Sequence, residues 1–162
     1  MTITPVVSSN DFIEIEYVAE QAFSVTPDSS LSEWLSFSEM KKNITDHRGL
    51  CLKASNENGK TVGMIYAQQE NPINGKEGLD KWVIVIAAVA PDETGKKIGE
   101  LLLKELEKQV KARDASKLFV YTNKDDERVI HFYQKNGYED AGWIRDYQYG
   151  KGNSAVFLLK YL

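Results

Sequence analysis

The feature that most constrains this chain is the apolar run from Trp82 to Ala90, WVIVIAAVA. Five of its nine residues are Val or Ile, which favours a β-strand that is buried on both faces. Pro91 ends the run, a polar loop spans residues 92–97, and helical spacing of apolar residues follows over residues 98–111. The run therefore predicts a strand–loop–helix unit at the centre of a fold that layers helices on a sheet.

The predicted helix has an apolar side that would face the sheet and a charged side that would face water. The apolar stripe consists of Ile98, Leu101, Leu102, Leu106 and Val110. The charged side consists of Glu100, Lys104, Glu107, Lys108 and Lys111.

The loop before this helix has the properties of an anion site. The first-turn N–H groups of a helix have no partner inside it, and the helix dipole adds partial positive charge there. Gly95 and Gly99 carry no Cβ, so a phosphate can approach the backbone, and Lys96 and Lys97 add positive charge. Ordinary turn chemistry at a strand–helix joint explains the same residues, and both interpretations remain open at this point.

Composition excludes several classes of protein. The chain has 162 residues, 42% of them hydrophobic and 27% charged, so one domain spanning residues 1–162 is expected. A net charge of −4 argues against a nucleic-acid partner, and no apolar run is long enough for a membrane span. The single Cys51 rules out a disulfide framework, and no metal-ligand spacing occurs. Without a signal-peptide pattern at its start, the chain is expected in the cytoplasm.

Periodicity and turn residues predict the remaining elements. Strands are expected at residues 3–7, 50–54, 61–68, 82–90, 117–122, 138–143 and 154–161. Helices are expected at residues 12–23, 31–38 with a weak continuation to 44, 98–111, and from Asp126 to the Asn136–Gly137 cap. The order is β-α-α-β-β-β-α-β-α-β-β, an α/β fold with a mixed sheet. The strands at 82 and 117 should be its parallel pair.

Two motifs in this order are the strand end Ala87–Pro91 with the loop Thr94–Gly99, and the helical segment Asp126–Tyr138. Together they resemble the GNAT superfamily of N-acetyltransferases. The first is the strand end Ala87–Pro91 with the loop Thr94–Gly99, where the family has Arg/Gln-x-x-Gly-x-Gly/Ala. Gly99 matches its last position, whereas Thr94 stands where Arg or Gln is usual and Lys97 where the first Gly is usual.

The second motif lies on the predicted helix near residue 130. Tyr133, Lys135, Gly137 and Tyr138 fit the family pattern in type and spacing. Asp126 replaces the usual Asn, which keeps the helix cap but loses an amide donor, and Asn123 is a candidate to supply that donor.

The resemblance implies acetyl-CoA as donor substrate and an amine as acceptor. The strand ending at Val89 would splay from the strand at 117, and the pantetheine arm would pair with the backbone of Ala87 and Val89. The pyrophosphate would lie on N–H groups of Thr94, Gly95, Lys96, Lys97, Ile98, Gly99 and Glu100, with Asn123 and Asp126 as further cofactor contacts. Val89 N–H would stabilise the oxyanion, and Tyr133 would protonate the leaving sulfur.

Several alternatives remain at this level. Taken alone, Tyr133 fits a core aromatic residue beside Val129 and Phe132. The general base is not visible, and Glu70 fits a solvated loop carboxylate better than a base. Tyr147 and Tyr149 are candidates to line the acceptor pocket, but a polyamine, an amino acid, an antibiotic and a protein N-terminus all remain possible acceptors.

Two other classes of function are also open. One is a non-catalytic acyl-CoA-binding module of the same fold, and the other is an interaction domain without cofactor. A homodimer through the strand Ala155–Leu162 is a further expectation from the resemblance.

Overall fold

The computed structural model describes residues 1–24, 31–70, 80–148 and 151–162. Within these residues, seven strands form one mixed sheet in the order β1-β2-β3-β4-β5-β7-β6, together with four α-helices, which is the predicted α/β class. The chain divides into two compact units, residues 1–68 with 85–110 and residues 69–84 with 111–162.

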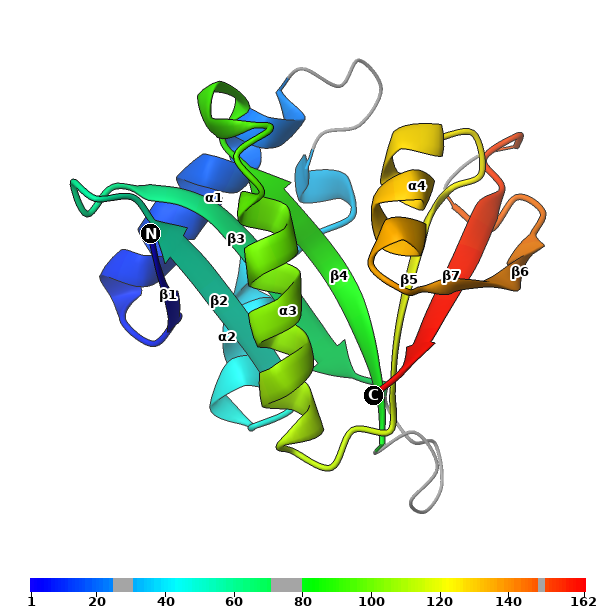
Figure 1. Cartoon of the computed structure of the whole chain (residues 1–162), viewed down its shortest axis with the longest axis horizontal. Coiled ribbons are helices and arrows are strands. Elements are labelled where there is room, and N and C mark those ends of the chain that lie inside the picture. The colour runs from blue at the N-terminus through cyan, green and yellow to red at the C-terminus, as the bar shows by residue number, and fades with distance from the viewer. Residues whose placement is uncertain (25–30, 71–79, 149–150) are drawn as a thin grey trace. The chain divides into compact units, whose positions relative to one another are not determined.

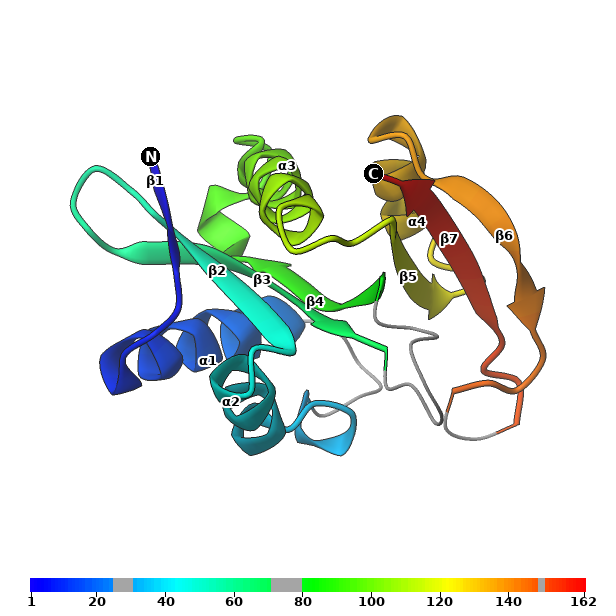
Figure 2. The same cartoon turned by 90° about the horizontal axis from the view of Figure 1, so that it is seen from below.

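The first unit places helices on both faces of its strands. Its first three strands are β1 (Thr2–Pro5), β2 (Gly49–Ser55) and β3 (Thr61–Gln69). β1 pairs antiparallel with β2, and β2 pairs antiparallel with β3. Helices α1 (Ser9–Phe23) and α2 (Phe37–Thr45) cover one face, and α3 (Ile98–Lys111) covers the other (Figures 1 and 2). A short 3-10 helix, Leu31–Glu33, precedes α2.

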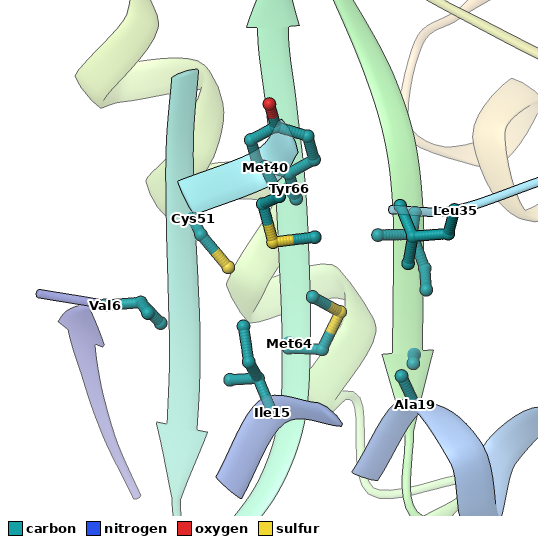
Figure 3. Packing of buried hydrophobic residues seen from close by; sticks show 10 residues of the cluster. Val6, Ile15, Ala19, Leu35, Met40, Cys51, Met64 and Tyr66 are labelled. Carbon is teal, nitrogen blue, oxygen red and sulfur yellow. The ribbon is translucent and has the colours of Figure 1, made fainter. Parts of the chain in front are cut away.

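The face under α1 and α2 holds an apolar core. Ile15 and Ala19 of α1 and Met40 of α2 pack with Cys51, Met64 and Tyr66 of the sheet (Figure 3). All six side chains are at most 1% exposed. Burial raises the pKa of the Cys51 thiol, so this cysteine is a packed apolar residue and not a nucleophile.

The opposite face depends on a glycine in β3. A Cβ at Gly63 would lie 2.9 Å from Ile98 Cγ2 and 3.1 Å from Leu102 Cδ1. The absence of a side chain at Gly63 therefore lets the first turn of α3 approach the sheet closely.

The second unit is built on β5 (Lys117–Asn123), β7 (Ala155–Tyr161) and β6 (Glu139–Ile144), with α4 (Glu127–Lys135) beside them (Figure 1). β5 and β6 both pair antiparallel with β7. The first residues of β4 (Lys81–Val89) pair parallel with β5, from Lys81↔Lys117 to Ile84↔Val120. This confirms the predicted parallel pair.

Three expectations about packing are wrong. β4 is not buried on both faces: burial alternates along it and Ala87 is exposed. On α3, Leu101 is 43% exposed and Leu103 is buried in its place. The second helix does not run from Leu31, because Ser36 caps a separate helix whose first residue is Phe37. The sequence pattern did not determine which elements cover β4 and α3, or at which residue α2 begins.

The expected dimer strand is also not an edge. β7 pairs with β5 on one side and with β6 on the other, so its backbone is already occupied. The edge strand of this unit is β6, whose six residues are all exposed.

Candidate active site

The end of β4 carries the first part of the candidate site. Ala90 N–H donates to the Val62 carbonyl of β3 (2.9 Å), and the Ala88 carbonyl lies near Gly63 of the same strand. Backbone groups of successive strand residues point to opposite edges, so those of Ala87 and Val89 point away from β3. The parallel ladder on that edge ends at Ile84, whereas β4 continues to Val89.

The loop that follows β4 presents a run of backbone donors. The N–H groups of residues 95–99 donate no hydrogen bond to any described part of the chain. Intrahelical bonding of α3 starts with Leu101 N–H, which donates to the Lys97 carbonyl (3.1 Å). Ile98 is 2% exposed and anchors the helix start, while Gly95 has nothing within 4 Å of the position of a Cβ. Such a run of N–H groups at a helix N-terminus is suited to an anion with several oxygens.

Lys97 adopts the backbone conformation that the family pattern assigns to glycine. Its φ is +61°, in the left-handed region that costs a residue with a Cβ about 1 kcal/mol, and φ at Gly95 is +82°. The loop thus keeps the shape expected of a glycine-containing turn although a lysine occupies the position. The Lys97 side chain is exposed.

The other lysine of the loop is already paired, which the sequence analysis did not anticipate. Lys96 Nζ lies 2.6 Å from Glu93 Oε2, and this ion pair raises the pKa of Lys96. Thr94 Oγ1 donates to the Pro91 carbonyl (2.9 Å), so its hydroxyl is held by the loop. The partly exposed Gly99 and Glu100 complete the first turn of α3.

Tyr133, in the second unit, is the candidate general acid. It lies on α4, is 3% exposed, and its ring packs edge-on against Phe132 (5.1 Å) and Tyr138 (5.2 Å). Burial raises the pKa of the Tyr133 phenol, which therefore stays protonated at neutral pH. No described residue hydrogen-bonds its hydroxyl, so the proton is not committed to a protein acceptor.

The start of α4 is organised by Asn123 and Asp126. Asp126 caps the helix by accepting the Val129 N–H (3.1 Å), as predicted. Asn123 Oδ1 accepts the Asp125 N–H (2.9 Å), which leaves the Asn123 amide NH₂ as a donor at the end of β5. Gly137 has φ of +87°, the predicted left-handed helix end.

The structure also bears on the weaker candidates for the base and for the acceptor pocket. Glu70 forms an ion pair with Lys81 (2.7 Å), the first residue of β4, whereas Val89 is the last. Eight residues of extended strand span roughly 26 Å, so a role for Glu70 as base near Val89 has no support. His131 is exposed, as expected from its helix face. Tyr147 is described and is 47% exposed, while Tyr149 lies outside the described residues.

Two kinds of feature are absent from the described residues. No three His, Cys, Asp or Glu side chains in the described ranges come together as metal ligands would. No helix in the same ranges combines the length and the apolar character that a membrane crossing requires.

Sequence reasoning missed two residues beside Tyr147. Tyr121 of β5 and Phe157 of β7 contact the Tyr147 ring at centroid distances of 5.1 and 5.0 Å. The alternation of residues in LFVY indicates that Tyr121 lies on the face opposite to Leu118, but the partner strand is not readable from that segment.

An uncapped helix start after β4 and a buried tyrosine on α4 are two features that the family resemblance implied, and the structure contains both. A family model described as "Acetyltransferase (GNAT) family" matches residues 12–138, more than half of the chain. The chain belongs to this family and is an acetyltransferase. No curated protein matches the sequence significantly.

Solved structures agree on the fold. Ribosomal-protein-alanine N-acetyltransferase from Brucella melitensis is 19% identical, with full coverage of both chains and a TM-score of 0.82. A phosphinothricin acetyltransferase from Sinorhizobium meliloti, in complex with AcCoA, is 20% identical over 99% of this chain and 88% of that chain, at 0.80. An aminoglycoside 6'-N-acetyltransferase complexed with coenzyme A is 18% identical over 99% and 97%, at 0.76. These identities establish the shared fold alone.

Proposed function

We propose that this protein transfers the acetyl group of acetyl-CoA to a primary amine. The observation that supports the proposal most is at the start of α3, where the N–H groups of residues 95–99 donate no hydrogen bond to any described residue. The chain also belongs to a family of acetyltransferases. Two of the similar structures contain coenzyme A or AcCoA, which supports the same donor here.

The residues present fit the donor substrate. The N–H groups from Thr94 to Glu100 would hold the pyrophosphate, and Lys97 would add a positive charge. The backbone of Ala87 and Val89, on the edge of β4 that points away from β3, would pair with the pantetheine amides. Asn123 would donate its amide NH₂ to the same substrate.

The reaction forms an N–C bond and breaks the C–S bond of the thioester. The amine must be neutral when it attacks, and it releases one proton afterwards. Charge develops on the carbonyl oxygen, where Val89 N–H would donate a hydrogen bond. The departing thiolate takes a proton, and Tyr133, kept protonated by its raised pKa, would supply it.

Calorimetric titration with acetyl-CoA, with free CoA as control, tests the first step. One-to-one saturable binding of both ligands is expected. Absence of heat at millimolar ligand would show that the loop with Lys97 does not bind the donor, and would overturn the proposed function.

Replacing Tyr133 with Phe tests the second step and separates an enzyme from a non-catalytic binding module. A general acid contributes about 10²-fold or more, so kcat should fall by roughly 100-fold while the Kd of CoA stays unchanged. Because the folded pKa of Tyr133 is raised, the wild-type rate should show no loss attributable to this phenol below about pH 10. An unchanged kcat in the variant would remove Tyr133 from the reaction.

The organisation of the molecule is also part of the proposal. We expect the two units to act as one domain, which predicts a single cooperative unfolding transition. A homodimer, if formed through a sheet edge, would use β1 or β6. Sedimentation that shows a monomer across micromolar concentrations would exclude the dimer. The cytoplasm remains the expected compartment.

A further inference from the structure

The turn that ends α4 holds the backbone of Tyr133. The Tyr133 carbonyl accepts the N–H groups of Asn136 (3.0 Å) and Tyr138 (3.1 Å), which both follow the helix. Gly137, with φ of +87°, lets the chain reverse between these two residues. The main chain of Tyr138 is therefore fixed to that of Tyr133 by a direct hydrogen bond.

The same turn also holds the Tyr133 ring. Tyr138 packs edge-on against this ring at a centroid distance of 5.2 Å, and Phe132 packs edge-on against it at 5.1 Å. Tyr138 is itself buried, with 2% of its surface exposed. Because no described residue hydrogen-bonds the Tyr133 hydroxyl, the direction of the phenol depends on how its ring is packed.

Lys160 of β7 fastens the turn to the sheet. Its Nζ donates to the Asn136 carbonyl (2.9 Å) and lies 5.6 Å from the centroid of the Tyr138 ring. Its Cε lies 3.6 Å from the position that a Cβ would take at Gly137. β7 is paired with β5 on one side and with β6 on the other, so Lys160 lies in the interior of the sheet of the second unit. One side chain thus contacts all three residues of the turn.

From these contacts we propose that Lys160 and Tyr138 are positioning residues for Tyr133. Lys160 fixes the turn, the turn fixes the Tyr138 ring, and that ring fixes the direction of the Tyr133 phenol. The inference rests on the proposed function, in which Tyr133 protonates the departing thiolate. It also gives a role to Gly137 and Tyr138, two positions of the helix motif that the proposed reaction itself does not use.

The rate of proton transfer should be sensitive to this support. A misplacement of about 1 Å can lower a rate on the order of 100-fold, even when it arises from a change outside the reacting groups. A phenol whose oxygen has no partner in the described chain can move whenever its ring contacts loosen. Loss of the Lys160 contact should therefore reach the reaction through the turn, without any contact between Lys160 and the substrate.

The first test is spectroscopic and needs no turnover. In protein with ¹³C-labelled tyrosine and phenylalanine, the Tyr133 ring signals are identified by their loss in Tyr133→Phe. In the wild type they should show nuclear Overhauser contacts with the rings of Tyr138 and Phe132. Lys160→Met should weaken the contacts with Tyr138 and broaden the Tyr133 signals. Unaltered contacts and line widths in folded Lys160→Met protein would overturn the proposal.

The second test asks whether the position of the phenol matters for the reaction. Thiol release from saturating acetyl-CoA is followed with hydroxylamine, a small amine that is largely uncharged at neutral pH. Lys160→Met should lower the rate roughly tenfold, a part of the roughly 100-fold expected for Tyr133→Phe, with the Kd of CoA unchanged. In the Tyr133→Phe background it should cause no further fall, because no phenol remains to be positioned. An equal fall in both backgrounds would assign Lys160 a merely structural role and overturn the proposal.

Conservative variants and a matched control sharpen both tests. Lys160→Arg keeps a cationic donor for the Asn136 carbonyl and Tyr138→Phe keeps the ring, so both should stay within about threefold of the wild-type rate. Tyr138→Leu removes the ring and should behave like Lys160→Met. The control is Arg113→Met: the Arg113 guanidinium lies 5.8 Å from the Trp82 ring, a similar cation–aromatic pair whose ring belongs to β4 and not to the turn. An effect of this control equal to that of Lys160→Met would contradict the proposal.

The outcomes separate this inference from the proposed function. A rate that falls in Tyr133→Phe but not in Lys160→Met or Tyr138→Leu overturns the positioning inference alone. A rate that Tyr133→Phe leaves unchanged removes Tyr133 from the reaction, and absence of CoA binding or of thiol release overturns the proposed function itself. If Lys160→Met does not fold, Tyr138→Leu takes its place in both backgrounds, with the same expected results.

Discussion

Two helix starts in the first unit are built in opposite ways. At the start of α1, Ser8 Oγ accepts the Asp11 N–H (3.1 Å), and the Asp11 carboxylate accepts the N–H groups of Ser8 (2.8 Å) and Val7 (3.1 Å). At the start of α3, Lys97 offers no side-chain acceptor, and the N–H groups of residues 95–99 find none in the described chain. The first start is closed by its own side chains, and the second is left open.

The difference shows which helix start is available for a ligand. Donors satisfied by a capping box stabilise the fold but cannot also bind a phosphate. The other helix starts are capped as well, by Ser36 at α2 and Asp126 at α4. Among the α-helices of the described chain, only α3 begins without a side-chain cap, and it follows β4. This uncapped start is the one at which the proposed function puts the donor substrate.

The largest expected effect comes from placing an acidic side chain at the open start. Lys97→Asp replaces a positive with a negative charge beside the undonated N–H groups. The Kd of CoA should rise roughly 100-fold, since a charge-assisted contact is lost and a repulsion is added. Calorimetry measures the change. The neutral control is Lys97→Asn, which tolerates the left-handed φ and should lose much less affinity; equal losses in both variants would contradict a charge effect.

The second effect concerns the closed start. Asp11 caps α1 and also contacts Lys53 Nζ (2.6 Å), so Asp11→Ala should destabilise the fold by about 2 kcal/mol at pH 7 and leave the Kd of CoA unchanged. Urea unfolding measures the first quantity and calorimetry the second. A change in CoA affinity without loss of stability would reverse the roles assigned to the two helix starts.

The same residue gives the stability a dependence on pH. Lys53 and the backbone N–H groups hold the pKa of Asp11 well below its usual range. A group whose folded pKa is depressed contributes stability above its unfolded pKa, near 4, and loses it as pH falls toward the folded pKa. The stability gap between wild type and Asp11→Ala should therefore shrink below about pH 4. A gap that stays constant from pH 7 to pH 3 would contradict this assignment.

The contrast also explains what the sequence could and could not predict. Asp126 was recognisable as a cap because capping depends on residues within one turn. Anion binding at the start of α3 stays a prediction. The exposure of Ala87 was not predictable from the sequence, since burial of the second face of β4 depends on which elements cover that face. The contacts of Tyr147 with Tyr121 and Phe157 were not predictable either, because these rings come from a loop, β5 and β7, which only the strand register brings together.

A smaller effect should follow from removing the backbone strain at Lys97, at the start of α3. Lys97→Gly removes the cost of a Cβ at φ +61° and should stabilise the fold by up to about 1 kcal/mol. It also removes a charge, so CoA affinity should fall modestly while stability rises. Urea unfolding and CoA calorimetry on the same samples give both values. A rise in both would show that the lysine has no role toward the donor.

The smallest effect should come from the neighbouring lysine. Lys96 is paired with Glu93 at 2.6 Å, so its charge is already balanced within the loop. Lys96→Met should change the Kd of CoA by less than about threefold, because solvent screens an exposed ion pair and it contributes little. Glu93→Gln is the complementary variant: by releasing Lys96 it should strengthen CoA binding slightly, with a steeper dependence on salt. If Lys96→Met weakened CoA binding as much as Lys97→Asp, the ion pair would have to break when the donor binds, and both lysines would belong to the open start of α3.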